Sequence, residues 1–114
     1  MRTKTLLWLD DMRDPNNGWA FKYTPFGNNP IDIIWVKSYN EFVNYIDTHG
    51  LPDGICFDHD LGEEKTGYDC AKYLVNYCLD HNYSIPKYKI QSSNPVGAAN
   101  IHSIMQTYMK YQGD

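Results

Sequence analysis

The sequence predicts one α/β domain with a mainly parallel sheet, because strand-like and helix-like segments alternate along the chain. Two observations support this. Three of the four strand-like runs are almost wholly apolar, as in strands that are covered on both faces of a sheet. Helical periodicity follows the second, third and fourth strand-like runs. Helices between strands imply right-handed crossovers and parallel pairing. We expect a compact three-layer domain over residues 1–114 with the strand order 2-1-3-4.

The four expected strands differ in how strongly the sequence marks them. Residues 5–10 (TLLWLD) form an apolar run that ends abruptly in acid, which is typical of a central parallel strand. Residues 32–37 (DIIWVK) and 54–58 (GICFD) form two more runs of this kind. Residues 88–91 (YKIQ) give a weaker pattern, so we expect the fourth strand towards the edge of the sheet.

The three expected helices begin at recognisable capping signals, in which a side chain can accept a hydrogen bond from a free backbone N–H. These signals are Ser38 with Glu41 as a capping box, Thr66 with Asp69, and Asn94 followed by Pro95. Gly50 ends the first helix. Apolar residues then repeat at helical spacing on one face of each helix, at Tyr39, Phe42, Val43 and Ile46, at Ala71, Leu74, Val75 and Cys78, and at Ile101, Ile104, Met105 and Tyr108.

Residues 14–30 show no helical period and hold three prolines, two glycines and four asparagines. We expect a long loop here in place of a first helix, and long loops in compact domains are often functional. The aromatic residues Trp19, Phe21, Tyr23 and Phe26 occur at near-alternating spacing in this segment. We expect them to cover the sheet face that the missing helix leaves open; a lid that stacks on a nucleobase is the alternative.

The composition limits the environment and the ligands. A net charge of -4 gives no basic field for non-specific nucleic-acid binding, so a phosphate ligand needs a local device such as a metal ion. The cysteines at 56, 70 and 78 form no C-x-x-C pair and are expected to be small buried side chains in a reducing compartment. The apolar run at residues 6–9 is too short for a signal sequence or a membrane span. We therefore expect a cytoplasmic protein.

Acidic residues follow two of the expected strands. Asp10 and Asp11 end the first strand, and Asp58, His59 and Asp60 end the third. If these strands are neighbours, up to four carboxylates converge, and like charges at that separation are costly. A bound Mg²⁺ or Mn²⁺ removes this cost, because both ions prefer hard oxygen ligands. The alternative is that each aspartate caps a loop or helix and faces water by itself.

Other polar residues are expected at the same sheet edge. His59 is a candidate metal ligand or general acid/base, with a loop histidine oriented by a carboxylate as the alternative. Ser92, Asn94 and the N-terminus of the following helix can together bind an anion, and Asn94 also serves as a helix cap. Arg13 can reach a phosphate with two hydrogen bonds. Its alternative is an ion pair with Asp14 or with the acidic cluster.

These residues resemble the receiver domain of two-component signalling. In that resemblance Asp10 and Asp11 match the acidic metal-binding pair, Asp58 the phosphoacceptor, and Ser92 the Ser/Thr that ends strand 4. A closer resemblance is to a divergent group, the cyclic-phosphate-processing receiver domain family. The matching stretches are residues 9–13 (LDDMR), 57–62 (FDHDLG), 66–69 (TGYD) and 92–97 (SSNPVG). The resemblance implies a flavodoxin-like fold.

The sequence departs from these families at two places. An ordinary receiver carries a lysine on its fifth strand, whereas no fifth strand is expected after Asn94, and Lys110 falls on a helix. The cyclic-phosphate family has a histidine before its Ser-x-Asn, where this chain has Gln91. An amide cannot move a proton as imidazole can, so more of the chemistry would depend on His59 and the metal.

The resemblance implies a metal-dependent phosphoesterase that acts on a cyclic nucleotide or on an RNA 2′,3′-cyclic phosphate end. The residues implied are Asp10, Asp11 and Asp58 for Mg²⁺ or Mn²⁺, Arg13, Ser92 and Asn94 for the phosphate, and His59 and Asp60, with Asp58, for the chemistry. One alternative is a degenerate stand-alone receiver, phosphorylated on Asp58 or binding a partner protein. Another is a protein that binds a cyclic nucleotide without cleaving it. A homodimer is a further alternative for the assembly of this chain.

Overall fold

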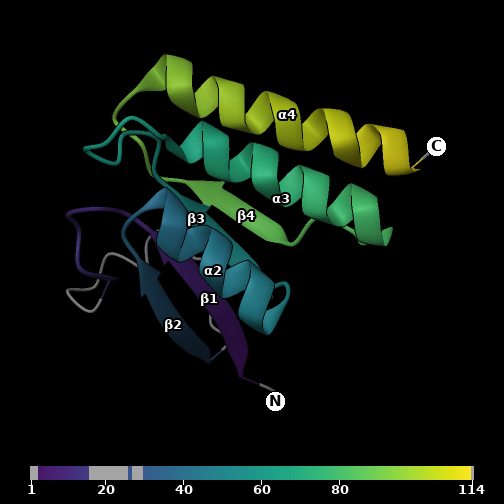
Figure 1. Cartoon of the computed structure of the whole chain (residues 1–114), viewed down its shortest axis with the longest axis horizontal. Helices are drawn as coiled ribbons and strands as arrows, with labels where there is room; N and C mark the ends of the chain where they lie inside the picture. The colour runs from purple at the N-terminus through teal and green to yellow at the C-terminus, as the bar shows by residue number, and fades with distance from the viewer. Residues whose placement is uncertain (1–2, 16–25, 27–29, 114) are drawn as a thin grey trace.

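The computed structural model describes residues 3–15, 26 and 30–113 (Figure 1). Its elements are β1 (Lys4–Leu9), β2 (Ile31–Val36), α2 (Tyr39–His49), β3 (Gly54–Phe57), α3 (Gly67–His81), β4 (Lys87–Ile90) and α4 (Pro95–Gly113). The strands form one parallel sheet in the order β2-β1-β3-β4. The predicted topology is therefore confirmed, and no strand follows β4 within residues 91–113.

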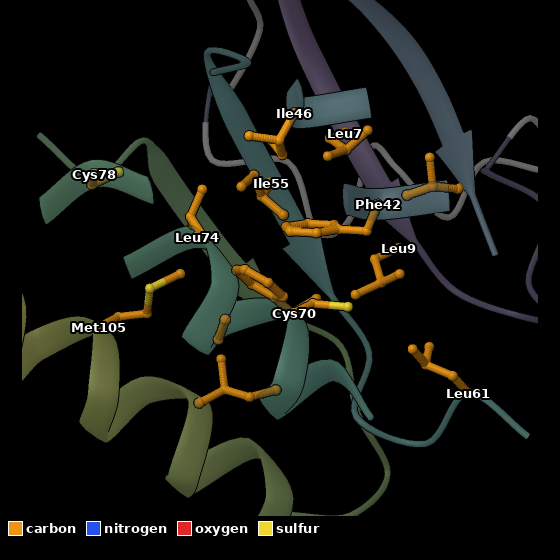
Figure 2. Packing of buried hydrophobic residues seen from close by; sticks show 14 of the residues in the cluster. Leu7, Leu9, Phe42, Ile46, Ile55, Leu61, Cys70, Leu74, Cys78 and Met105 are labelled. Carbon is orange, nitrogen blue, oxygen red and sulfur yellow. The ribbon is translucent and has the colours of Figure 1, made fainter. Parts of the chain in front are cut away.

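The three described helices pack over one face of the sheet, with α3 in contact with both α2 and α4 (Figures 1 and 2). The side chains of Leu7, Leu9, Ile55 and Phe57 form a core with these helices and are fully buried. Figure 2 shows Phe42 of α2 and Leu74 of α3 directed into the same core. All of the helix-face residues predicted from the sequence except Val43 belong to this core or pack against it.

The opposite face of the sheet is also covered. Leu6, Trp8 and Cys56 point to this face and are fully buried in a second cluster that includes Phe26. Burial on both faces explains why the central strands are almost continuously apolar. Phe26 is thus one of the expected covering aromatics. Trp19, Phe21 and Tyr23, and the expected absence of a helix between β1 and β2, lie outside the described residues.

The helix caps follow the predicted signals with one difference. Thr66 and Asp69 form a complete capping box at α3, and Asn94 Oδ1 accepts a hydrogen bond from the Gly97 N–H at 2.9 Å. Ser38 Oγ accepts from the Glu41 N–H at 3.1 Å, as expected. The Glu41 carboxylate, however, accepts from the Lys37 N–H at 3.3 Å. The Ser38 half of the capping box is therefore present, whereas the Glu41 carboxylate bonds to the N–H one residue before Ser38.

The strands end one residue earlier than predicted, but the hydrogen bonding continues past each end. The Asp10 N–H donates to the Val36 carbonyl and the Asp58 N–H to the Leu9 carbonyl, both at 3.1 Å. The Gln91 N–H donates to the Phe57 carbonyl at 2.9 Å. These bonds fix the backbone at the sheet edge, where the polar residues begin.

The three cysteines are free and buried, as the sequence predicts. Burial raises the pKa of the Cys56 thiol to about 12 and that of Cys78 to about 11, and it also raises the pKa of Cys70. These thiols are therefore poor nucleophiles near neutral pH. Among the described helices, none has the length and apolar character needed to cross a membrane.

Candidate functional site

Three carboxylates converge at the carboxyl ends of β1 and β3, which are neighbouring parallel strands. Asp10, Asp11 and Asp58 each offer an oxygen that lies within 4.8 Å of the oxygens of the other two. Asp10 and Asp58 are buried, with 1% and 8% of their surface exposed, and Asp11 is half-buried. The predicted convergence of these residues is present.

Asp10 organises the turn that follows β1. Its Oδ1 accepts hydrogen bonds from the backbone N–H groups of Met12 and Arg13, both at 2.9 Å. Two indoles fix the same turn from outside, because Trp35 Nε1 donates to the Asp10 carbonyl at 2.7 Å and Trp8 Nε1 to the Arg13 carbonyl at 3.0 Å. Trp8 belongs to β1 and Trp35 to β2, so these bonds tie the turn to the sheet. They thereby set the direction of the Asp10 and Arg13 side chains.

Asp58 holds its charge in an unfavourable environment. Burial raises the pKa of Asp58 to about 6, and the negative charges of Asp10 and Asp11 act in the same direction. The hydrogen bond from the His59 N–H to Oδ1, at 2.9 Å, and the charge of Arg13 lower the pKa in part. A cation placed among the three carboxylates would offset this cost.

The residues fit a hard divalent cation. Three carboxylates supply oxygen donors, the ligand type that Mg²⁺ and Mn²⁺ prefer. The carboxylates line a cavity of about 330 Å³, open to solvent, whose wall consists of Asp10, Asp11, Met12, Arg13, Asp58, Asp60, Gly62 and Ser93. Gly62 has a φ of 67°, and a Cβ there would lie 3.1 Å from Asp11 Oδ2, so glycine keeps this side of the cavity open.

His59 forms a second polar group beside the carboxylates. Its Nδ1 lies 2.9 Å from Asp60 Oδ1 and 3.4 Å from Asn94 Nδ2. Asn94 Nδ2 also lies 3.5 Å from Asp60 Oδ1. The hydrogen bond with His59, followed by that with Asn94, lowers the pKa of Asp60. The imidazole is thus oriented by a carboxylate, as one of the two sequence alternatives proposed, and this arrangement is compatible with proton transfer.

Arg13 and Ser92 have structural partners. The Arg13 guanidinium donates to the Gln91 carbonyl at 2.5 Å and lies 3.7 Å from Asp10 Oδ2, so the predicted pairing with the acidic cluster is present. About a third of the Arg13 side chain is exposed (32%), and it lines the cavity. Ser92 Oγ accepts from the Asn94 N–H at 3.0 Å, and the serine that lines the cavity is Ser93.

Comparison with known proteins identifies the family to which this chain belongs. A sequence profile described as the cyclic-phosphate processing receiver domain matches residues 5–107. The chain belongs to this family. Among curated proteins, none matches the chain significantly.

Two solved structures are similar in fold to this receiver-like domain. One is a fusion that carries the trimeric coiled coil of yeast Spc42, with a TM-score of 0.63 and 17% identity. The match covers 91% of this chain and 62% of that one, so the receiver-like domain corresponds to under two thirds of its length. The other is the phosphorylated cyanobacterial phytochrome response regulator RcpA, with a TM-score of 0.53, 14% identity and coverage of 97% and 92%. At these identities the similarity shows the fold alone, and that fold is receiver-like.

Gln91, which the sequence analysis placed where the family has a histidine, makes contacts in this receiver-like domain that the sequence did not predict. The side chain is buried, and its Nε2 lies 3.3 Å from the Leu9 carbonyl and 3.5 Å from Asp10 Oδ2. Within the described part of the chain, Gln91 Oε1 has no hydrogen-bond partner although it is buried. Gln91 therefore contacts the Asp10 carboxylate at the same oxygen, Oδ2, that lies near Arg13.

Two glycines were also missed, and both are needed for close packing at the site. A Cβ at Gly97 would lie 2.3 Å from Cγ of His59, so the imidazole rests directly on the first turn of α4. A Cβ at Gly67 would lie 1.8 Å from the Asp58 carbonyl oxygen, so α3 begins against the backbone that carries Asp58. Both glycines lie in stretches that resemble the family, TGYD and SSNPVG. That resemblance was the signal in the sequence that could have identified them.

Proposed function

We propose that this protein is a metal-dependent phosphoesterase that opens a cyclic phosphate, either in a cyclic nucleotide or at the 2′,3′-cyclic end of an RNA. The observation that carries the proposal is the grouping of three carboxylates around one cavity with Arg13, beside the His59–Asp60 pair. The family, named for cyclic-phosphate processing, supports the choice of substrate.

The carboxylates of Asp10, Asp11 and Asp58 would hold Mg²⁺ or Mn²⁺. When bound, such an ion polarises a phosphoryl oxygen and makes a water molecule more acidic. Asp10 and Asp58 are buried and held by backbone N–H groups, so these carboxylates need little rearrangement to bind a cation. Asp11, which is half-buried, faces the more open side of the cavity beside Gly62.

The phosphate would be bound by donors at the rim of the cavity. Arg13 keeps one guanidinium nitrogen on the Gln91 carbonyl, which fixes the side chain, while its exposed part can donate to an anion. We assign the remaining contacts to Asn94 Nδ2 and to Ser92. In this chain Ser93 lies on the cavity wall, and it is a further donor for the same role.

The proton steps would fall to His59 and Asp60. In ring opening, water adds to phosphorus, one ring P–O bond breaks, and the leaving oxygen receives a proton. With Nδ1 directed to the Asp60 carboxylate, His59 has Nε2 left to donate or accept that proton. The Gln91 amide cannot transfer a proton. The His59 imidazole alone would therefore accept a proton from the attacking water and donate one to the leaving oxygen.

The test is turnover of 2′,3′-cyclic nucleotides by the purified protein with Mg²⁺ or Mn²⁺, with EDTA as the blank. We expect a phosphomonoester product, and loss of at least about a hundredfold in rate for Asp58→Asn and for His59→Gln. Glu64→Gln, in the exposed turn before α3, is the matched control and should keep full activity. Absence of metal-dependent product from the wild-type protein would overturn the proposal.

A second function is favoured by Asp58 itself, which is a buried carboxylate at the end of β3 in a receiver-like fold. A receiver would accept a phosphoryl group on Asp58. Labelling by acetyl phosphate, absent in Asp58→Asn, would support this function. Against it, no lysine is found among the described residues that line the cavity. A third function, binding of a cyclic nucleotide without cleavage, is favoured by Gln91. Tight binding with recovery of intact ligand would support it.

We also propose a cytoplasmic location. The support is chemical: three free cysteines, each buried and with a raised thiol pKa, are typical of proteins in a reducing compartment. Fractionation of cells that express the tagged protein would test this.

A further inference from the structure

β4 lies at one edge of the sheet and, among the described strands, pairs only with β3 (Figure 1). In a parallel strand alternate residues direct their N–H and C=O groups to a given neighbour. The Gln91 N–H donates to Phe57 of β3, so Lys89 and Lys87 are also directed inward. The backbone groups of Tyr88 and Ile90 therefore point away from the sheet, as a strand edge that can accept another strand.

A groove runs along this edge. It has a volume of about 550 Å³ and lies between β4 and the side of α4 that carries His102, Gln106 and Met109. Tyr88 fixes its wall, because the Tyr88 hydroxyl lies 2.9 Å from His102 Nδ1 and accepts from Gln106 Nε2 at 2.8 Å. Ile90 supplies apolar surface beside it. The groove thus has room for side chains next to an open strand edge.

The same edge is positively charged. Lys87 and Lys89 are exposed, and they alternate with Tyr88 and Ile90, which pack towards the helices. The lysines therefore lie on the sheet face away from α3 and α4. Neither lysine has an ion pair with any residue in the described ranges, although the whole chain has a net charge of -4.

The lysines disfavour a second copy of this chain at the edge. In the antiparallel register that pairs both outward-directed residues, Tyr88 would lie opposite Ile90 of the other copy and Lys89 directly opposite Lys89. Like charges at opposed positions of a strand pair are destabilising. A strand that carries acidic residues at those positions would instead gain two attractive cross-strand pairs.

We propose that the β4 edge binds an extended acidic segment of a partner protein by strand addition. The segment would hydrogen-bond to the backbone of Tyr88 and Ile90. Its alternate residues would be apolar, filling the groove against α4, and acidic, lying beside Lys87 and Lys89. This surface is separate from the carboxylate cavity, so the inference does not depend on the proposed function.

The first test uses the peptide acetyl-Glu-Val-Glu-Val-Glu-Val-amide and amide NMR of the ¹⁵N-labelled protein. We expect saturable shifts at Tyr88 and Ile90, and slower hydrogen exchange at these two amides than without peptide. The amide of Lys89, already bonded within the sheet, should change little. A peptide with Lys in place of Glu is the control. No saturable shift, or equal shifts with both peptides, would overturn the proposal.

The second test reverses the charge of the edge. Lys89→Glu should weaken binding of the Glu-Val peptide by about fivefold or more, and it should improve binding of the Lys-Val peptide. Lys72→Glu, which makes the same charge change on α3, should alter both affinities by less than about twofold. Tighter binding of the Lys-Val peptide by Lys89→Glu would show that this variant is folded. Equal effects of the two variants would contradict the inference.

Discussion

The charge on Asp58 lowers the stability of the folded protein when no cation is bound. In the unfolded chain this carboxyl ionises near pH 3.8, and burial raises its pKa in the folded state to about 6. The unfolded state therefore loses the proton first as the pH rises. The free energy of unfolding falls across this window, and the full cost is present above about pH 6.

Replacement of Asp58 by Asn should therefore stabilise the metal-free protein. At pH 7.5 we expect a gain of about 1 to 3 kcal/mol in the free energy of unfolding, since each pKa unit corresponds to about 1.4 kcal/mol. At pH 3.5 the two proteins should differ little. Urea unfolding in EDTA at both pH values measures this. An equal difference at the two pH values would show that the charge is not the cause.

Gly97 should tolerate no side chain. Replacement of glycine by alanine inside an unhindered helix stabilises a protein by up to about 1 kcal/mol. At Gly97 the new methyl group would overlap the His59 ring, so we expect a loss of about 1 to 3 kcal/mol instead. Chemical denaturation of Gly97→Ala gives the sign. A more stable variant would mean that the ring is free to move away.

At the scale of elements, the N-terminus of α4 has two tasks that depend on one side chain. Asn94 Oδ1 caps the helix through the Gly97 N–H, and Asn94 Nδ2 lies near Asp60 and His59. The cap stabilises the helix in every state of the site, whereas the amide nitrogen matters only to the polar group beside it.

Substitutions at Asn94 should separate these tasks. Asn94→Ala should lower the free energy of unfolding by about 1 kcal/mol, because the cap is lost. Asn94→Ser keeps a capping oxygen, so its stability should stay close to wild type, while turnover or ligand binding falls as in Asn94→Ala. Thermal denaturation and the nucleotide assay together check this. Equal stability losses in both variants would contradict the separation.

Capping also explains why the helices could be predicted well. Each signal lies within four residues of sequence, as in Thr66 and Asp69, so local chemistry decides where the helix begins. The contacts that build the site are different. Gly97 lies 38 positions from His59, and Gln91 contacts Asp10 across 81 positions. No local sequence pattern contains residues so far apart. The stretches that resemble the family were the indication that these residues belong to one site.

The acidic cluster is an intermediate case. Asp10, Asp11 and Asp58 could be predicted to meet because apolar strands in an α/β sheet bring their carboxyl ends together. Which serine would line the cavity could not be predicted, because a turn after β4 decides whether Ser92 or Ser93 faces outward. Ser92 Oγ is engaged with the Asn94 N–H inside that turn. The prediction for Ser92 as a phosphate ligand remains to be tested.

At the scale of the whole molecule, metal binding should raise global stability. A ligand present at about a hundred times its Kd adds about 2.7 kcal/mol to the free energy of unfolding. We expect Mg²⁺ or Mn²⁺ to raise the Tm of the wild-type protein by several degrees at pH 7.5, and by less at pH 5, where protons compete for Asp58.

The measurement is a thermal-shift series of divalent cations crossed with cyclic nucleotides. Asp58→Asn should lose most of the metal effect, and Glu64→Gln should keep it. A shift with metal and nucleotide together that exceeds the sum of the two separate shifts would show that the two ligands bind cooperatively. The absence of any metal-dependent shift would refute the central proposal about the carboxylates.

The two indoles beside the turn after β1 give the protein an intrinsic optical reporter. Trp8 and Trp35 each donate a hydrogen bond to a carbonyl of the segment that carries Asp10 and Arg13. Indole emission depends on the electric field and the hydrogen bond at Nε1. Any ligand that shifts this turn should therefore change the emission of unlabelled protein, so that binding at the carboxylates can be followed in real time.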